Sequence, residues 1–551
     1  MNNRIFSLAA VVLWFFVGSC MAQQTIGVNA IVPKPVSAIA TGKAPVAIST
    51  QTVIVADGAF QQQAVYLQEL LQKQLGYTLK VVNSPKQAGN ATQILLQQDP
   101  AAAPTAEMYV LEAAGKKLSI KAKDVPGVVH GIQTLLQLLP LQKQKGAAQV
   151  AAVQIKDYPR FGYRGMHLDV SRHIFPVEFI KKYIDYLAFH KFNTFHWHLT
   201  DDQGWRLEVK SYPKLNTVAA YRNLTLIGHF KDTPARYDST RYGGVYTQAE
   251  VKDIIKYAAV RGITIIPEID IPGHSRAIIA AYPEFSTRPD TTWQVANTWG
   301  MYNRQNNVLA PNPATFKFLE TIFNEVADLF PSEYIHIGGD ETSKMWWKAS
   351  PSAQAFMKAN GLKDEKELQT YFIKFVANKL EKKGKKIIGW HEIMEGKLDT
   401  TAVVMVWAGE KQAVEAAKKQ HRIIMTPGKP FYFDAYQSKD PKDSLAIHGY
   451  NPLDAVYNYN PVPAELKTLN LEKYIWGGQG NVWTEYMEYP SKVEYMVFPR
   501  MTALSETLWT PLEKKDYADF KRRLKQYIIP RYQYWGAGYF KNFEQWTIDK
   551  Q

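Results

Sequence analysis

The chain has 551 residues, of which 46% are hydrophobic and 21% charged, the usual proportions of a globular protein. A chain of this length and composition can bury a large core, which excludes a disordered protein, a collagen and a small disulfide scaffold. Lys and Arg number 65 against 51 Asp and Glu, so the net charge is +14. Because this excess is spread along the chain and no nucleic-acid-binding motif accompanies it, we expect a solvated basic surface and no nucleic-acid partner.

Residues 1–22 are typical of an export signal. Arg4 precedes the mostly apolar residues 5–17, a stretch that matches a signal peptide and is too short for an ordinary membrane span. Cleavage after Ala22 would give a soluble periplasmic or secreted protein. The residues up to Cys20, however, resemble a bacterial lipoprotein cleavage box, which would give a lipid anchor there, and both outcomes stay open. Cys20 is the only cysteine, so no intrachain disulfide is expected. No later segment reaches 18 apolar residues, and no membrane span is expected.

Residues 30–157 predict a small α+β accessory domain. Apolar, β-branched runs favour strands, and longer segments between them favour helices. We expect strands at 53–55, 79–82, 93–96 and within 108–120, and helices at 60–75 and 128–139.

From residue 158 onward, short apolar runs alternate with amphipathic helical segments, which predicts βα units and a parallel sheet. Eight strands are expected, at 163–169, 194–200, 263–269, 334–338, 386–390, 402–407, 422–426 and 474–477. Eight units favour a (β/α)8 TIM barrel over 158–512, followed by a helical extension, 513–551, packed on the barrel. The alternative is a doubly wound open sheet, but no Gly-x-Gly-x-x-Gly follows the first strand.

Polar or aromatic residues lie within or just past the end of each expected barrel strand, near the position of the catalytic groups of such barrels. They include Asp169, Arg172, His173, His196, His198, Asp201, Asp202, Asp270, His274, Asp340, Glu341, Trp390, His391, Glu392, Trp407, Tyr432, Asp434, Trp483 and Glu485. Carboxylates and guanidinium groups bind sugar hydroxyls, and indole rings cover the apolar faces of a sugar. The strand ends therefore predict a carbohydrate site.

The adjacent pair Asp340-Glu341 follows Gly338-Gly339 at the end of an expected strand. Two neighbouring side chains reach one ligand only at an irregular turn, which glycines allow. A nearby carboxylate and partial burial raise the pKa of one member of such a pair, as a general acid requires. The pair is the strongest catalytic candidate in the chain.

His196 and His198 lie on the same face of an expected strand, so with Asp201 they are also compatible with a metal site. Buried histidines that tune a carboxylate are the competing interpretation. We favour the second and expect no metal and no cofactor.

Four segments, in this order, resemble the family 20 glycoside hydrolases, the β-N-acetylhexosaminidases. They are residues 163–173, 191–205, 267–274 and 338–341. The resemblance extends over about residues 30–512 and includes the α+β domain, which is similar to the accessory domain of that family. It implies a retaining reaction in which the 2-acetamido oxygen of the substrate attacks the anomeric carbon and forms an oxazolinium intermediate.

The resemblance also implies a role for each matching residue. Glu341 is the general acid and base, and Asp340 orients the acetamido N–H and stabilises its positive charge. Tyr432 donates to the acetamido oxygen, and Asp201 and His274 form a relay that tunes Glu341. The remaining residues bind the sugar: Trp390, Trp407 and Trp483 wall it, and Arg172, Asp434 and Glu485 hold its 3-, 4- and 6-hydroxyls.

The sequence thus predicts an exo-acting, retaining β-N-acetylhexosaminidase that removes terminal non-reducing GlcNAc or GalNAc from glycans or chitooligosaccharides. One alternative is a carbohydrate-binding barrel without hydrolysis, against which the presence of both Asp340 and Glu341 argues. Another is a lacto-N-biosidase-like specificity, against which Arg172 and Glu485 argue. The third is the metal-dependent hydrolase. The sequence does not choose the natural glycan, the sugar epimer or the oligomeric state.

Overall fold

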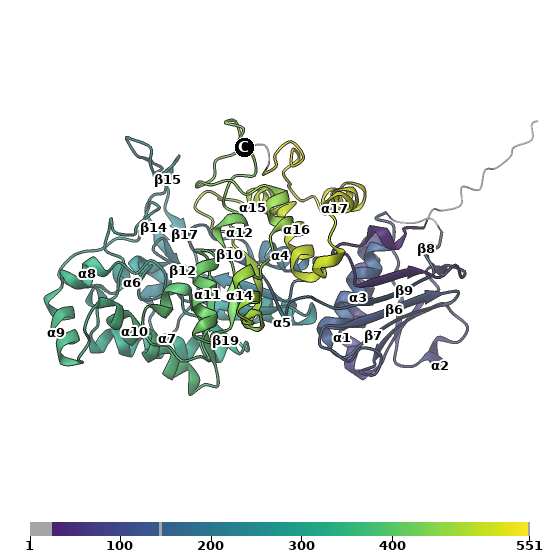
Figure 1. The fold of residues 1–551 in the computed structure, drawn as a ribbon, viewed down its shortest axis with the longest axis horizontal. Coiled ribbons are helices and arrows are strands. Elements are labelled where there is room, and N and C mark those ends of the chain that lie inside the picture. The colour runs from purple at the N-terminus through teal and green to yellow at the C-terminus, as the bar shows by residue number, and fades with distance from the viewer. Residues whose placement is uncertain (1–24, 143–145, 549–551) are drawn as a thin grey trace, which may run out of the picture.

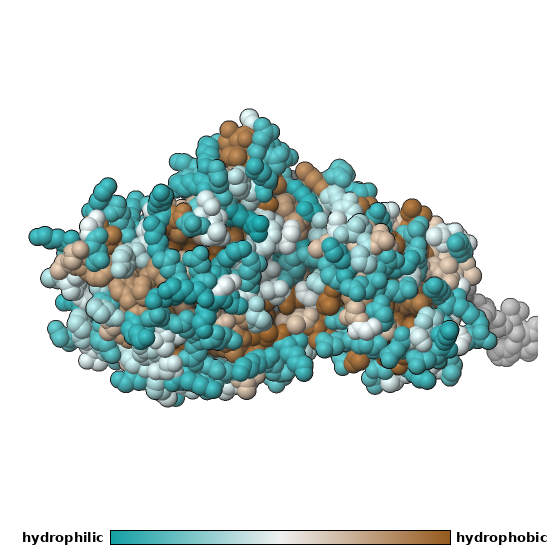
Figure 2. All heavy atoms as spheres, turned by 90° about the horizontal axis from the view of Figure 1, so that it is seen from below, coloured by the Kyte–Doolittle hydropathy of each residue, from teal (hydrophilic) through white to brown (hydrophobic). Residues whose placement is uncertain are grey.

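The computed structural model describes residues 25–142 and 146–548, which form an elongated molecule with a sheet domain at one end and a barrel at the other (Figure 1). The expected signal segment and Cys20 lie outside the described residues. Within the described ranges, no helix is both long and apolar enough to cross a membrane. Hydrophilic residues cover most of the face drawn in Figure 2, with smaller hydrophobic areas between them.

A seven-stranded mixed sheet forms the first domain, in the order β1-β9-β6-β7-β5-β3-β4. β3 pairs in parallel with β4 and β5, and β5 pairs in parallel with β7. β6 runs antiparallel to both of its neighbours, β7 and β9. The strands are β1 Ser37–Ala40, β3 Val53–Ala56, β4 Lys80–Val82, β5 Gln93–Gln98, β6 Tyr109–Ala114, β7 Lys117–Ala122 and β9 Val153–Asp157. A separate two-stranded sheet pairs β2 Val46–Ile48 with β8 Ala148–Val150.

Two helices, α1 Gln61–Leu75 and α3 Val125–Gln137, cover one face of this sheet. Side chains alternate across a strand, so Ile54 of β3 joins the core beneath these helices, whereas Val53 and Val55 pack on the opposite face near the short helix α2 Pro85–Ala88. The predicted α+β fold is confirmed.

Eight parallel strands close into a barrel, because β23 pairs with β10. They are β10 Tyr163–Asp169, β11 Thr194–His198, β18 Thr264–Glu268, β19 Tyr334–His336, β20 Lys386–Trp390, β21 Val403–Val406, β22 Ile423–Met425 and β23 Ile475–Gly480. Each falls within or beside a predicted strand. The predicted TIM barrel is confirmed, and the open-sheet alternative is wrong.

Amphipathic helices surround the barrel, as their apolar spacing requires. The longer ones are α4 Val177–Phe189, α5 Gln248–Val260, α7 Pro313–Leu329, α10 Glu365–Glu381, α11 Glu410–Lys418 and α16 Arg500–Trp509. Helix α5 begins at a capping box, in which Thr247 and Glu250 each bind the backbone of the other.

The end of the chain packs against the barrel helices. Phe520 of α17 Tyr517–Arg523 and Tyr532 of α18 Ile529–Tyr534 lie in the same buried core as the barrel helices. Arg523 binds both carboxylate oxygens of Glu506 on α16, each at 2.7 Å. The exact domain boundaries given above remain predictions.

Candidate active site

The carboxyl ends of the barrel strands surround a cavity of about 290 Å³. Most of the predicted site residues line it: Arg172, Asp201, His274, Asp340, Glu341, Trp407, Tyr432, Asp434, Trp483 and Glu485. The first and last of them, Arg172 and Glu485, are 313 positions apart in the chain, and barrel closure brings them together.

An irregular turn after β19 presents the acidic pair. Gly338 and Gly339 have φ values of 68° and 95°, and Glu341 itself has a φ of 41°, in the left-handed region. A Cβ atom on Gly338 would lie 1.7 Å from Oδ1 of Asp270, and that same oxygen accepts from the backbone N–H of Gly339 at 3.1 Å. The turn points both Asp340 and Glu341 into the cavity, the arrangement that the Gly-Gly pair predicts.

Burial raises the pKa of both acids. The pKa of Asp340 is raised to about 7, because desolvation outweighs the opposing effect of cationic His274. The pKa of Glu341 is also raised by desolvation and is likewise opposed by His274, although 45% of its side chain is exposed in the cavity. Glu392 raises the pKa of both. The pKa of Asp340 thus lies near neutral pH, and that of Glu341 is shifted in the direction that a general acid requires.

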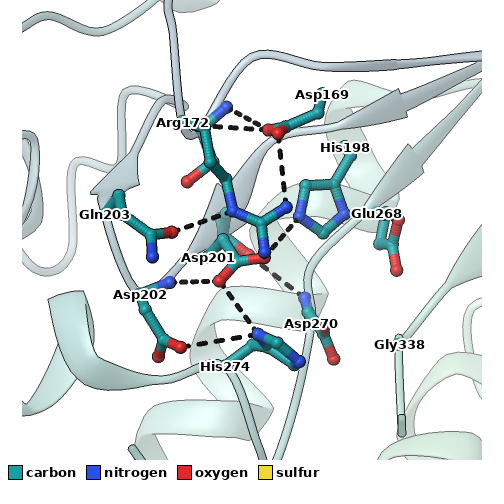
Figure 3. Close-up of polar contacts among 12 residues, drawn as sticks. Asp169, Arg172, His198, Asp201, Asp202, Gln203, Glu268, Asp270, His274 and Gly338 are labelled. Atoms are coloured by element: carbon teal, nitrogen blue, oxygen red, sulfur yellow. Dashed lines mark hydrogen bonds and ion pairs between the residues drawn. The ribbon is translucent and has the colours of Figure 1, made fainter. Parts of the chain in front are cut away.

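His274 lies between this pair and Asp201. Its Nδ1 is 2.9 Å from Asp201 Oδ1, and its Nε2 is 3.6 Å from Asp340 Oδ2 and 3.7 Å from Glu341 Oε2. Burial lowers the pKa of His274, but the negative charges of Asp201 and Asp340 raise it by a larger amount. The pKa of His274 therefore lies well above the ordinary value. Figure 3 shows Asp201 among Arg172, His198 and His274.

A polar corner of the cavity contains Arg172, Asp434 and Glu485. Arg172 Nη2 is 2.7 Å from Asp201 Oδ2, and Nη1 is 3.8 Å from Glu485 Oε1. Burial and the nearby Glu485 raise the pKa of Asp434 to about 8. The corner thus combines a guanidinium held by Asp201 with the carboxylates of Asp434 and Glu485. Each of these two carboxylates has a buried oxygen without a hydrogen-bond partner among the described residues.

Aromatic rings form the walls. Trp407 and Trp483 are half-buried and line the cavity, and the Tyr432 ring lies 6.4 Å from that of Trp483. Trp390 differs from the prediction. It is 1% exposed, donates from Nε1 to Glu268 at 2.9 Å and lies behind Trp483, with 5.9 Å between ring centroids. Trp390 therefore supports the wall, because the buried carboxylate holds its indole below the cavity.

Four buried polar atoms at the cavity have no hydrogen-bond partner among the described residues. They are His274 Nε2, Asp340 Oδ1, Asp434 Oδ1 and Glu485 Oε2. Buried polar groups are normally paired, since each unpaired group costs about 1–3 kcal/mol. Convergence of such groups on one cavity indicates the positions at which a polar ligand binds.

The cavity also contains residues that the sequence did not single out. They are Gln203, Phe230, Gly300, Met301, Ile447 and His448. Gln203 accepts from Arg172 Nε at 2.9 Å and lies in the segment 191–205, so its motif could have indicated it. The others lie on long loops away from the strand ends and carried no sequence signal.

The histidines of β11 take part in hydrogen bonds that do not suit a metal site. His196 Nδ1 lies 3.0 Å from Gln479 Nε2, a donor, so its proton lies on Nε2, which faces Glu268 at 2.9 Å. Both ring nitrogens of His198 face carboxylate oxygens. A metal ligand needs a free nitrogen lone pair, which neither ring then offers toward Asp201. The metal-site alternative is not supported by this bonding.

Comparison with known proteins agrees with this geometry. A family model for the glycosyl hydrolase family 20 catalytic domain matches residues 161–512, and one for domain 2 of the same family matches residues 28–158. The chain belongs to glycosyl hydrolase family 20. The resemblance inferred from the sequence is thereby confirmed.

Relatives within family 20 carry related names. The β-hexosaminidase of Porphyromonas gingivalis is 42% identical over 504 residues, covering 90% of this chain and 62% of that protein. The β-hexosaminidase of Vibrio furnissii is 41% identical over 400 residues, covering 72% of this chain and 64% of that protein. The chain thus spans less than two thirds of the length of these two relatives.

A solved structure shares the whole fold. The exo-β-N-acetylglucosaminidase of Vibrio harveyi, solved in complex with N-acetylglucosamine, superposes with a TM-score of 0.82 at 35% identity. The match covers 94% of this chain and 79% of that one.

Proposed function

We propose that this chain is an exo-acting, retaining β-N-acetylhexosaminidase that removes terminal non-reducing GlcNAc or GalNAc from glycans or chitooligosaccharides. The observation that carries the proposal is the set of four unpaired buried polar atoms around a cavity with aromatic walls. At about 290 Å³, the cavity lies at the lower end of the range for ligand pockets, which suits one sugar unit and hence exo action.

Glu341 is the proposed general acid and base. Its raised pKa favours a protonated carboxyl in the free site, ready to protonate the glycosidic oxygen as the C1–O bond breaks. The acetamido oxygen forms the new bond to C1 and gives the oxazolinium. The Glu341 carboxylate then takes a proton from water as the water oxygen binds C1 and the acetamido oxygen leaves. Two inversions at C1 give overall retention.

Asp340 and Tyr432 are proposed to act on the acetamido group. Without ligand, the Asp340 anion is disfavoured, as its pKa of about 7 reflects. The oxazolinium carries a positive charge, and this charge favours the Asp340 anion as it develops. Tyr432 lies at the same cavity, and burial raises its pKa well above the ordinary value, so its hydroxyl stays a donor for the acetamido oxygen.

The remaining residues are proposed to hold the sugar. Trp407 and Trp483 cover its apolar faces, with Trp390 behind them. Arg172, Asp434 and Glu485 bind the 3-, 4- and 6-hydroxyls through the polar corner. The Vibrio harveyi enzyme named above, an exo-β-N-acetylglucosaminidase crystallised with N-acetylglucosamine, supports this assignment of substrate class.

The variant Glu341→Gln tests the proposed acid. We expect kcat on an aryl N-acetyl-β-glucosaminide to fall by about 10²–10⁴, because general acid–base catalysis contributes a factor of that size. The far-UV circular dichroism spectrum and melting temperature should match those of the wild type. Wild-type turnover by the folded variant would overturn the role of Glu341, and an inactive wild type would overturn the proposed function.

We also propose that residues 1–22 direct export, with either soluble release or a lipid anchor at Cys20. Expression with a radiolabelled fatty acid distinguishes the two outcomes. Label in the wild type that is lost in Cys20→Ala would establish the anchor, and an unlabelled mature protein beginning at Gln23 would establish soluble release.

A further inference from the structure

His198 ends strand β11, contacts the cavity residue Asp201 and is fully buried. Its Nδ1 lies 2.6 Å from Glu268 Oε2, and its Nε2 lies 3.1 Å from Asp201 Oδ2 (Figure 3). Ionised carboxylates only accept hydrogen bonds, so both ring nitrogens must donate. The geometry therefore requires a doubly protonated, cationic imidazole.

Glu268 is held as an anion by the donors around it. Besides His198, its carboxylate accepts from Trp390 Nε1 at 2.9 Å and faces His196 Nε2 at 2.9 Å. His336 Nδ1 also lies 3.0 Å away, but it accepts from the backbone N–H of Gly338 at 3.1 Å and is therefore not a donor to Glu268. Donors around a buried carboxylate stabilise its ionised form. The neighbouring histidines hold the pKa of Glu268 well below the usual range despite burial.

Asp201 distributes its two oxygens between different partners. Oδ2 binds two cations, Arg172 at 2.7 Å and His198 at 3.1 Å. Oδ1 accepts from the backbone N–H of Asp202 at 2.5 Å and faces His274 Nδ1 at 2.9 Å. This division fixes the rotation of the carboxylate, and it leaves His274 with Nε2 directed at the acidic pair.

We propose that His198, anchored by Glu268, is a positioning residue for the reaction: a permanent cation that keeps Asp201 ionised and turned toward His274, and so controls the protonation of Glu341. The inference rests on the proposed function, since it assigns a role in the same reaction. Through Trp390, the same Glu268 carboxylate also fixes the aromatic wall, so one buried anion orients both halves of the site.

Other charged and titratable groups face His198 from the neighbouring strands. Asp169 on β10 raises its pKa, as do Glu268 and Asp201, whereas burial lowers it; together they place the pKa at about 10. His167 on β10 lies 5.6 Å away between ring centroids, and burial keeps its pKa well below the ordinary value, so that ring is neutral. Arg172 is a second cation beside His198, because its Nη2 binds the same oxygen of Asp201 at 2.7 Å.

The first test is made on the wild-type protein. In protein labelled with ¹⁵N-histidine, the Nδ1 and Nε2 resonances of His198, assigned by their loss in His198→Gln, should both have imidazolium chemical shifts from pH 6 to pH 8.5. One unprotonated nitrogen at pH 7.5 would overturn the proposal. This measurement needs no substrate, so its outcome is independent of the proposed function.

The second test compares His198→Gln with His336→Gln, a matched control that also faces Glu268 but does not contact Asp201. Loss of the His198 cation should raise the pKa of Glu341, and loss of the fixed orientation of His274 should raise it as well. We therefore expect the basic limb of the kcat profile to move to higher pH in His198→Gln, kcat to fall about tenfold or more, and KM to change little. His336→Gln should leave the basic limb in place. An unmoved limb in His198→Gln, or an equal movement in both variants, would contradict the positioning role.

Discussion

Buried carboxylates dominate the chemistry of the cavity. Desolvation raises the pKa of Asp340 to about 7 and of Asp434 to about 8, and it also raises the pKa values of Glu341 and Glu485. Each raised value means that the folded protein holds a carboxylate in an environment that disfavours its charge. Such groups cost stability in the ligand-free protein and are compensated when a polar ligand binds, which is characteristic of a functional site.

Asp434→Asn should stabilise the free protein in a pH-dependent way. The folded pKa of about 8 exceeds the ordinary value of 3.8, so the native state binds more protons than the unfolded state between these values, and stability falls as the pH rises through this window. The variant lacks this penalty. Its melting temperature should match the wild type near pH 4 and exceed it at pH 9, by a gain in unfolding free energy on the order of a few kcal/mol. A difference that does not grow with pH would contradict the assignment, and kcat/KM should fall because Asp434 is a proposed sugar contact.

At the residue scale, the sequence predicted the residues of the cavity well, because strand ends of a barrel converge whatever the loops between them do. It did not predict the depth of Trp390. That depth depends on Glu268, whose carboxylate binds the indole from inside the barrel. No spacing in the sequence shows which acid lies inside and which faces the ligand.

The turn between β19 and the acidic pair is the element on which the site depends. Gly338 has a φ of 68° and lies against the Asp270 side chain. The turn therefore requires both the left-handed backbone angle and the absence of a side chain at this position. The strain continues into Glu341, a non-glycine residue with a positive φ. Strain of this kind is maintained only where the surrounding structure compensates for it.

Gly338→Ala should reduce the unfolding free energy by about 3 kcal/mol or more and also reduce kcat, because the new Cβ displaces Asp270 and rotates the acidic pair. Gly361→Ala is the matched control. Gly361 has a φ of 66°, and no described atom outside its own neighbours would lie within 4 Å of an added Cβ. That variant should lose only about 1–2 kcal/mol, the cost of the left-handed angle, and keep its kcat. Equal losses in urea unfolding would show that contact with Asp270 is unimportant.

At the element scale, the eight barrel strands were predictable because strands buried on both faces form short, continuous apolar runs. The strands β1, β2, β8 and β9 were not predicted. β2 and β8 have three residues each, and β1 is an edge strand with a partly exposed pattern. Residues 108–120 were predicted as strand, and the structure divides them into the hairpin β6–β7 at Gly115, whose φ is 60°.

Across the whole molecule, the sheet domain and the barrel share a buried charged contact. Asp157 at the end of β9 accepts from Lys191 Nζ at 2.8 Å, Tyr109 at 2.8 Å and Trp509 at 2.9 Å. Asp157 and Lys191 are both fully buried. This contact joins the first domain to the loop before β11, and therefore to the strand that carries His198.

Asp157→Asn should lower the unfolding free energy by about 3–5 kcal/mol, because it leaves the Lys191 ammonium buried without its counter-ion. The double variant Asp157→Asn/Lys191→Met should recover much of this loss. Thermal unfolding of both variants measures the effect. A double variant no more stable than the single one would show that the unpaired ammonium is not the cause.

The central claim for the molecule is that the substrate supplies its own nucleophile. The most direct test compares kcat/KM for 4-nitrophenyl N-acetyl-β-D-glucosaminide with that for 4-nitrophenyl β-D-glucoside, which lacks the acetamido group. Intramolecular attack in a favourable orientation supplies about 7–11 kcal/mol, so we predict that the glucoside reacts at least about 10³-fold more slowly. Comparable values of kcat/KM for the two substrates would contradict substrate-assisted catalysis in this protein.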